Sequence, residues 1–228
     1  MIYVNETATA ESARIPSAAA YDACFTGDEN QEAAELVRIA LENGQLDDAA
    51  AVIDGLLIIA PENGENWHLR GVLMMLRQRH LEAAIAFENA LARGADPRKA
   101  RLGIGMAELG LNQVQRAWEV FAELVLEDPG DAEALHWLLR AGCAANRWED
   151  LRVRLVRYLT IKPNDASVRF ALAGVNVRLG RIDSARLEYE ALRRIAPELQ
   201  GLDELRVAVD AADAPIVGAE LALAASAA

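Results

Sequence analysis

Catalysis by an imidazole or a thiol would have to use the three histidines and two cysteines of this sequence. Cys24 and Cys143 lie 119 residues apart, which matches no zinc or disulfide spacing. His136 and Cys143 would share a helix face but lie about 10 Å apart along it, too far for an imidazole to activate a thiol. His68 and His80 belong to no recognised motif, and no phosphate loop or paired-carboxylate motif is present. We therefore expect no enzyme, no metal site and no cofactor.

The composition is typical of a soluble folded protein with an acidic surface. The chain has 228 residues, 53% of them hydrophobic, which is enough to bury a core. Its 35 acidic and 23 basic residues give a net charge of −12, so nucleic acid would be repelled and is not an expected partner. The charged residues Glu6, Glu11 and Arg14 occupy the region of a signal peptide, and no run of about 18 uncharged apolar residues follows.

These features predict a cytoplasmic protein without membrane insertion, and two distant cysteines fit a reducing compartment. Lysine occurs only at Lys99 and Lys162 while alanine is abundant, which suggests a GC-rich bacterial source.

The sequence has an internal repeat of 34 residues, and this repeat determines which elements carry the histidines and Cys143. Pro61, Pro129, Pro163 and Pro197 lie on steps of 34, and Ala95 occupies the one step without proline. Comparison in this register defines five blocks: 30–63, 64–97, 98–131, 132–165 and 166–199.

Each block has the pattern of two short helices, with apolar residues three and four apart on either side of a break at the fifteenth residue. Small residues recur at the eighth and twentieth places, and the twenty-fourth is large and apolar or aromatic: Ile53, Phe87, Phe121, Leu155 and Tyr189. We expect the small residues to let the two helices approach and the large one to fill the space between them. The fifteenth residue is expected to end the first helix in a left-handed conformation: Gly44, Gln78, Asn112, Asn146 and Gly180.

The sequence resembles the tetratricopeptide repeat family. The second block carries the family pattern best, with the residues Trp67, Gly71, Met74, Ala83, Phe87 and Ala90. The resemblance covers residues 30–199 and implies an all-α, right-handed superhelical solenoid of five repeats. The fourth block departs from the pattern at Leu139, Leu151 and Tyr158, where we expect a wider helix spacing or a local bend.

Outside the repeats, residues 200–213 are predicted to form a capping helix that covers the last repeat. Residues 1–29 form an N-terminal extension in which 17–26 could add a helix, and 214–228 form an alanine-rich tail.

In the family, the first helix of each repeat lines a concave groove that receives peptides. The resemblance therefore implies a mostly apolar groove lined by His68, Val72, Met75, Leu102, Met106, Leu109, His136, Arg140, Cys143, Phe170 and Val177. The lysine and asparagine with which some members grip a C-terminal carboxylate are absent. His68 and His136 would lie two repeats, or roughly 20 Å, apart and cannot share a metal ion.

Charge is distributed unevenly along the chain. Residues 1–131 have a net charge of −12, residues 132–199 have +4, and residues 200–228 have −4. A basic patch is predicted at Arg140, Arg147, Arg178 and Arg181, so a partner with acidic residues beside apolar anchors should prefer this portion.

Together these observations predict a non-enzymatic protein–protein interaction module, a scaffold or chaperone-like adaptor that binds an apolar or amphipathic segment of a partner protein. The resemblance to this family suggests that the protein serves a bacterial secretion or surface-assembly system. The alternative is a structural protein that forms homo-oligomers through charge-complementary ends or through its C-terminal tail.

Overall fold

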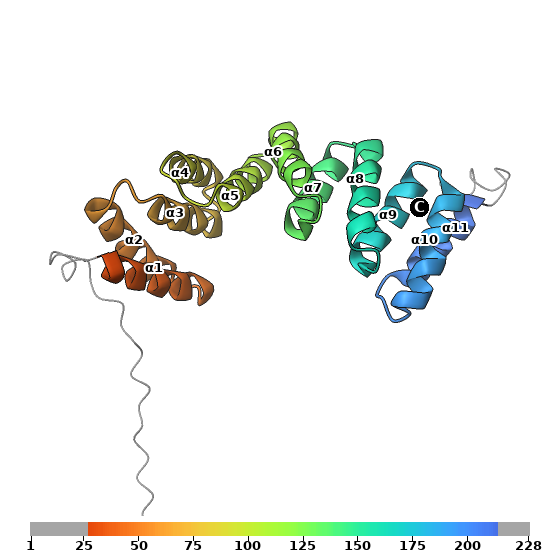
Figure 1. The fold of residues 1–228 in the computed structure, drawn as a ribbon, viewed down its shortest axis with the longest axis horizontal. Coiled ribbons are helices and arrows are strands. Elements are labelled where there is room, and N and C mark those ends of the chain that lie inside the picture. Colours follow the sequence, from red (N-terminus) through yellow and green to blue (C-terminus); the bar gives the residue numbers. More distant parts are fainter. Residues whose placement is uncertain (1–26, 214–228) are drawn as a thin grey trace, which may run out of the picture. The chain divides into compact units, whose positions relative to one another are not determined.

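The computed structural model describes residues 27–213, and within them it contains eleven α-helices and no β-strand, which confirms the predicted all-α fold. The predicted helix at 17–26 and the tail at 214–228 lie outside the described residues. Successive helices pack side by side as hairpins, for example α3 with α4 and α9 with α10 (Figure 1). The helices are α1 Gly27–Glu42, α2 Leu46–Ile59, α3 Gly64–Leu76, α4 His80–Ala92, α5 Pro97–Gly110, α6 Val114–Glu127, α7 Ala132–Ala144, α8 Trp148–Ile161, α9 Ala166–Arg178, α10 Ile182–Ile195 and α11 Leu202–Asp213.

The turn inside each hairpin has a residue with a left-handed backbone conformation at the same repeat position. The predicted positive φ is confirmed at all five break positions, with values of 73° at Gly44, 59° at Gln78 and Asn112, 55° at Asn146 and 68° at Gly180. The next residue donates its backbone N–H to a carbonyl five positions earlier, as Arg79 does to Met74 at 2.8 Å and Arg147 to Gly142 at 2.8 Å. This hydrogen-bond pattern satisfies carbonyls at the end of the first helix and reverses the chain.

The entry into each later repeat is set by a side-chain cap. Asp131 accepts from the backbone N–H of Ala134 at 3.0 Å, Asp165 accepts from Val168 at 3.0 Å, and Asn63 accepts from Glu65 at 2.9 Å. Asp96 accepts from Lys99 and Arg98 before α5, and these backbone hydrogen bonds lower the pKa of its carboxyl group. Such caps use up N–H groups that a helix start otherwise leaves without partners.

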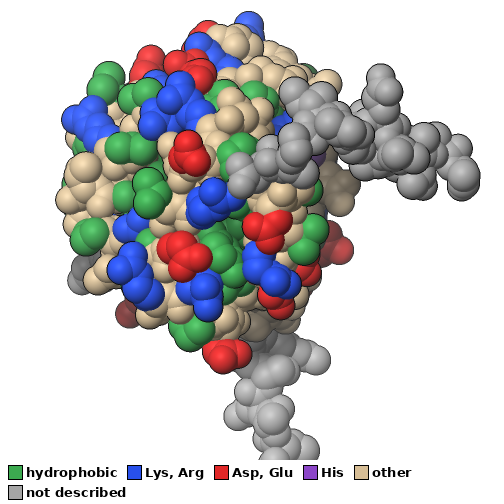
Figure 2. Space-filling model, turned by 90° about the vertical axis from the view of Figure 1, so that its right-hand side faces the viewer, with side chains coloured by type: hydrophobic (Ala, Val, Ile, Leu, Met, Phe, Trp, Pro, Cys, Tyr) green, Lys and Arg blue, Asp and Glu red, His purple; other side chains and the backbone are tan. Residues whose placement is uncertain are grey.

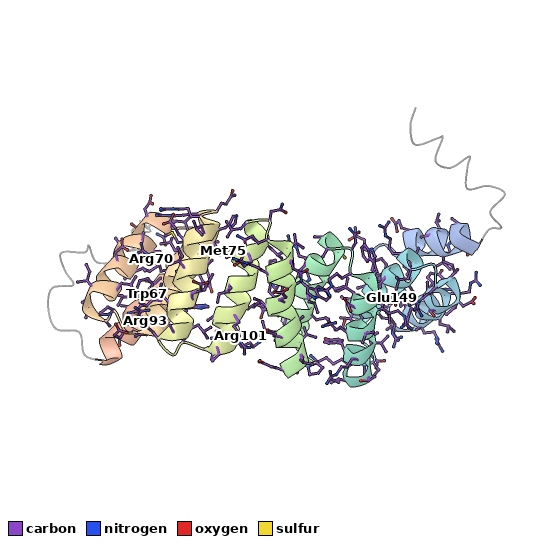
Figure 3. All side chains as sticks on the ribbon, turned by 90° about the horizontal axis from the view of Figure 1, so that it is seen from above. Trp67, Arg70, Met75, Arg93, Arg101 and Glu149 are labelled. Atoms are coloured by element: carbon purple, nitrogen blue, oxygen red, sulfur yellow. The ribbon has the colours of Figure 1, made fainter. Side chains whose placement is uncertain are left out.

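The chain divides into two compact units, one up to Ala107 and one from Glu108, and the boundary lies near the end of α5. In the first unit, Phe87 of α4 fills the space that two glycines leave. A Cβ atom on Gly71 would lie 2.5 Å from the Phe87 ring, and one on Gly103 would lie 2.7 Å from it. The indole of Trp67 donates to the carbonyl of Pro61 at 2.7 Å, and the Arg93 guanidinium packs over its ring (Figure 3).

In the second unit, Gly142 provides the room that the large residue Leu151 occupies. A Cβ on Gly142 would lie 2.5 Å from Trp118 and 2.7 Å from Leu151, so the glycine of α7 accommodates a leucine where the other repeats have alanine. Tyr158, another departure of the fourth block, is 1% exposed and donates its hydroxyl hydrogen to Asp165 at 2.7 Å. Because Asp165 also caps α9, this hydrogen bond links the fourth repeat to the fifth.

Candidate functional site

An open groove of about 810 Å³ lies in the second unit, between the first helices of its repeats. Its walls come from α7, α9 and α11, with one side chain from α8. No acidic residue lines it, and most of its side chains are apolar. The lining residues are His136, Leu139, Arg140, Cys143, Trp148, Phe170, Ala171, Gly174, Val175, Val177, Arg178, Leu205 and Ala208.

The helical repeat places these side chains on one surface. Along α9, Phe170, Gly174 and Val177 are separated by four and three residues, which is the spacing of one helix face. Gly174 leaves this face open, because a Cβ atom there would meet no other atom within 4 Å. Val175 and Leu205 are buried and form part of the floor. The result is a shallow apolar trough with space above α9.

Two arginines at the groove are held by tryptophan rings. The guanidinium of Arg140 lies 4.7 Å from the centre of the Trp137 ring, and that of Arg178 lies 5.1 Å from the centre of the Trp148 ring. Both arginines are exposed. In the part of the chain that the structure describes, neither forms an ion pair with a carboxylate.

The other two arginines of the predicted basic patch are engaged elsewhere. Arg147 pairs with Asp150 at 2.9 Å and packs over Trp118, and Arg181 pairs with Glu149 at 2.9 Å. Neither lines the groove. Basic, acidic and apolar side chains are also intermingled on the face that Figure 2 presents. The groove therefore brings together two of the four predicted arginines.

Cys143 is an exposed thiol on the α7 wall of the groove. Partial burial raises the pKa of this thiol, and the nearby Arg178 cation opposes that rise. The ring of His136, two turns earlier on the same wall, packs edge-on against Trp137 with ring centres 5.7 Å apart. In the described residues, no three His, Cys, Asp or Glu side chains cluster as a metal site would require.

The predicted groove residues fall into both units. His136, Arg140, Cys143, Phe170 and Val177 line the groove of the second unit. Leu109 also belongs to the second unit, is half-buried and does not line that groove.

The remaining predicted residues lie in the first unit, and several of them serve its core. Leu102 is 7% exposed and offers little surface to a ligand. His68 packs against Phe87 with ring centres 5.3 Å apart, and burial lowers the pKa of its imidazole. Val72 and Met75 pack on the core of this unit, and Met106 is half-buried (Met75 is labelled in Figure 3).

Sequence reasoning missed seven lining residues: Leu139, Trp148, Ala171, Gly174, Val175, Leu205 and Ala208. Leu205 and Ala208 lie 34 residues after Ala171 and Gly174, so extending the repeat phase by one step would have placed α11 on the groove. Trp148 begins a second helix, a position that the rule for first helices does not include.

None of the described helices combines the length and the apolar character that crossing a membrane requires. The sequence model of the tetratricopeptide repeat family matches residues 34–100 and 75–132. A comparison with curated protein sequences found no match.

Several solved structures share the fold. YrrB, described as a TPR protein with an unusual peptide-binding site, aligns with a TM-score of 0.63 and 15% identity over 76% of this chain and 90% of YrrB. MamA from Desulfovibrio magneticus RS-1 aligns with a TM-score of 0.65 and 17% identity over 77% of this chain and 99% of MamA. Pseudomonas aeruginosa pilF aligns with a TM-score of 0.61 and 14% identity over 80% of this chain and 88% of pilF. The chain thus contains tetratricopeptide repeats in residues 34–132, and its described helices have the fold of solved tetratricopeptide repeat proteins.

Proposed function

We propose that this protein is a non-enzymatic interaction module and that the groove between α7, α9 and α11 holds an apolar or amphipathic segment of a partner protein. The observation that supports this most is the groove itself, whose lining is mostly apolar, open to solvent and free of acidic residues. Its volume of about 810 Å³ falls within the range of about 300–1,000 Å³ typical of ligand sites.

The driving force would be burial of apolar surface. Phe170, Val177 and Leu139 keep part of their surface exposed in the groove, and a partner that covers them gains about 25 cal/mol per Å² of apolar area removed from water. An amphipathic helix or an extended strand with apolar side chains on one face fits a trough of this kind. The open space above Gly174 is where a side chain of the partner would enter.

The wider role that fits these properties is that of a scaffold or chaperone-like adaptor in the bacterial cytoplasm, serving a secretion or surface-assembly system. The description of YrrB as a peptide-binding TPR protein supports peptide capture by this fold. The composition, with few lysines and many alanines, supports the bacterial source.

The test is a selection of random peptides displayed on phage against the immobilised full-length chain, followed by measurement of the selected peptides by fluorescence anisotropy. Gly174→Trp should place a large ring in the groove, because the Cβ position of residue 174 faces open space; circular dichroism checks that the variant keeps its helical content. We expect it to weaken binding at least tenfold, while Gly174→Ala, the matched control, retains most of the affinity. Selected peptides that bind Gly174→Trp as tightly as the unaltered chain would exclude the groove as their site.

The alternative of self-assembly is favoured by apolar side chains that face solvent on second helices. Ile58 of α2 is 82% exposed, Leu126 of α6 is 66% exposed and Leu187 of α10 is 71% exposed. Contacts between charge-complementary ends would add to these and weaken with salt. Light scattering on the full chain and on a chain lacking residues 214–228, at low and high salt, tests this alternative. A monomer under every condition would remove it.

A further inference from the structure

We propose that the groove of the second unit selects partner segments that carry at least two carboxylates beside their apolar anchors, and that Arg140 and Arg178 recognise these carboxylates. This inference rests on the proposed function, because it assigns a partner chemistry to the same groove.

The first argument is that the two guanidiniums are available. Several other arginines of this unit already have carboxylate partners: Arg147 has Asp150, Arg169 has Glu188 and Arg181 has Glu149. Arg140 and Arg178 pack over Trp137 and Trp148 and, within residues 27–213, pair with no carboxylate. A guanidinium that stacks on a ring keeps its edge donors free for a carboxylate.

The second argument is that both cations are held in place before a partner arrives. Stacking on an indole ring restricts the many rotamers of an arginine side chain. Binding then loses less side-chain entropy than it would with a freely rotating arginine. Recognition by these two residues is therefore preorganised.

The third argument is the charge of the lining. Arg140 comes from α7 and Arg178 from α9, and an apolar surface that includes Phe170 and Val177 belongs to the same groove. With no carboxylate in the lining, an acidic partner meets two cations and no opposing charge, whereas a basic partner meets repulsion. The chemistry that matches is an apolar stretch flanked by aspartate or glutamate.

A partner chain matches this requirement better than the C-terminal residues of the protein itself. The side chains of residues 214–228 are mostly apolar, and among them only Glu220 offers a carboxylate, so these side chains cannot pair with both guanidiniums. We therefore assign the groove to a segment of another protein with two or more acidic residues. Occupation by residues 214–228 becomes an outcome that the experiment can reveal.

The experiment compares peptides selected from one phage library by three full-length proteins: the unaltered chain, Arg140→Gln/Arg178→Gln, and Arg147→Gln/Arg181→Gln. The last is a matched control, because it removes two arginines of the same unit that lie outside the groove. We expect peptides selected by the unaltered chain and by the control to be enriched in acidic as well as apolar residues. The groove double variant should retain the apolar enrichment and lose the acidic one.

Affinity measurements on the acidic peptides complete the test. Each groove substitution should weaken their binding by up to about fivefold, and raised salt should weaken binding to the unaltered chain more than to the double variant. Acidic enrichment that is absent, or that survives in the double variant, overturns the inference and leaves the proposed function standing. Failure to select any peptide contradicts the proposed function itself. A marked gain of affinity for the same peptides when residues 214–228 are deleted would assign the groove to that segment and overturn the inference.

Discussion

The guanidinium of Arg178 lies 5.1 Å from the centre of the Trp148 ring, and both residues line the same groove. Trp148 begins α8 and Arg178 ends α9. A tryptophan of the fourth repeat therefore positions the guanidinium of an arginine in the fifth repeat. The same cation acts on Cys143, whose pKa it lowers against the larger effect of burial. Packing between repeats thus sets the electrostatics of the groove.

This relationship predicts the reactivity of the Cys143 thiol. Replacing Arg178 by glutamine removes a cation that favours the thiolate, so the pKa of Cys143 should rise further and alkylation at a fixed pH near 8 should slow. The rate is measured against pH in a Cys24→Ser background, so that one thiol reacts. Arg181→Gln serves as the control and should leave the profile unchanged, whereas a faster reaction in Arg178→Gln would contradict the assignment.

Two glycines of the second unit should respond oppositely to alanine. Gly174→Ala should stabilise the fold by about 0.5–1 kcal/mol, because it removes a flexible residue from the middle of α9 where the methyl group has space. Gly142→Ala should destabilise it by about 1–3 kcal/mol, because the methyl group would overlap Trp118 and Leu151. Urea denaturation of the two variants measures both changes. Shifts of the same sign would show that the packing of α7 is not as described.

Tyr158 should make stability depend on alkaline pH. Burial, followed by its hydrogen bond with Asp165, raises the pKa of Tyr158 from its ordinary value near 10 to about 12. The folded state therefore favours the neutral phenol, and this contribution is complete below pH 10 and disappears as the pH rises towards 12. At pH 7, Tyr158→Phe should lose about 1–2 kcal/mol of stability through the missing hydrogen bond.

The difference in free energy of unfolding between the unaltered chain and Tyr158→Phe should accordingly shrink between pH 10 and 12. Urea denaturation at a series of pH values provides the comparison. A constant difference across this range would mean that the phenol ionises as readily in the folded state as in the unfolded one.

Phe87 and Gly71 of the first unit should show strongly non-additive effects. Phe87→Ala should cost about 3–5 kcal/mol by leaving a cavity in the core, and Gly71→Ala should cost about 1–3 kcal/mol by overlapping the ring. In the Phe87→Ala background the ring is absent, so Gly71→Ala should be neutral or stabilising. A double-mutant cycle from denaturation curves measures the coupling, and additive losses would refute the contact.

The 34-residue repeat pattern correctly predicted the features that depend on local sequence, namely the turn conformations and the packing within a hairpin. The left-handed conformation at Gln78, Asn112 and Asn146 follows from their place at the end of a helix, and the structure has it at each position. The predicted roles of Gly71 and Phe87 are likewise confirmed, because the spacing of small and large residues determines how two helices of one hairpin approach.

The groove was harder to predict, because its lining depends on contacts between repeats. Leu102 was placed on the groove by its position in the repeat, but it is largely buried in the structure. Arg147 has the same residue type as Arg140, yet an aspartate three residues later pairs with it. The contact between Leu151 and Gly142 could not be predicted from the repeat pattern either. The other repeats have alanine at the twentieth place, so the pattern does not indicate that a glycine makes room for leucine there.

The most direct test of peptide capture by the second unit is the alkylation rate of Cys143 in a Cys24→Ser chain, with and without a saturating selected peptide. Since Cys143 lies on the groove wall, we predict that the bound peptide slows the reaction at least tenfold. A thiol introduced as Leu187→Cys in a chain lacking both native cysteines lies outside the groove and should react equally fast in both conditions. An unchanged rate at Cys143, while anisotropy shows the peptide bound, would contradict the groove as the binding site.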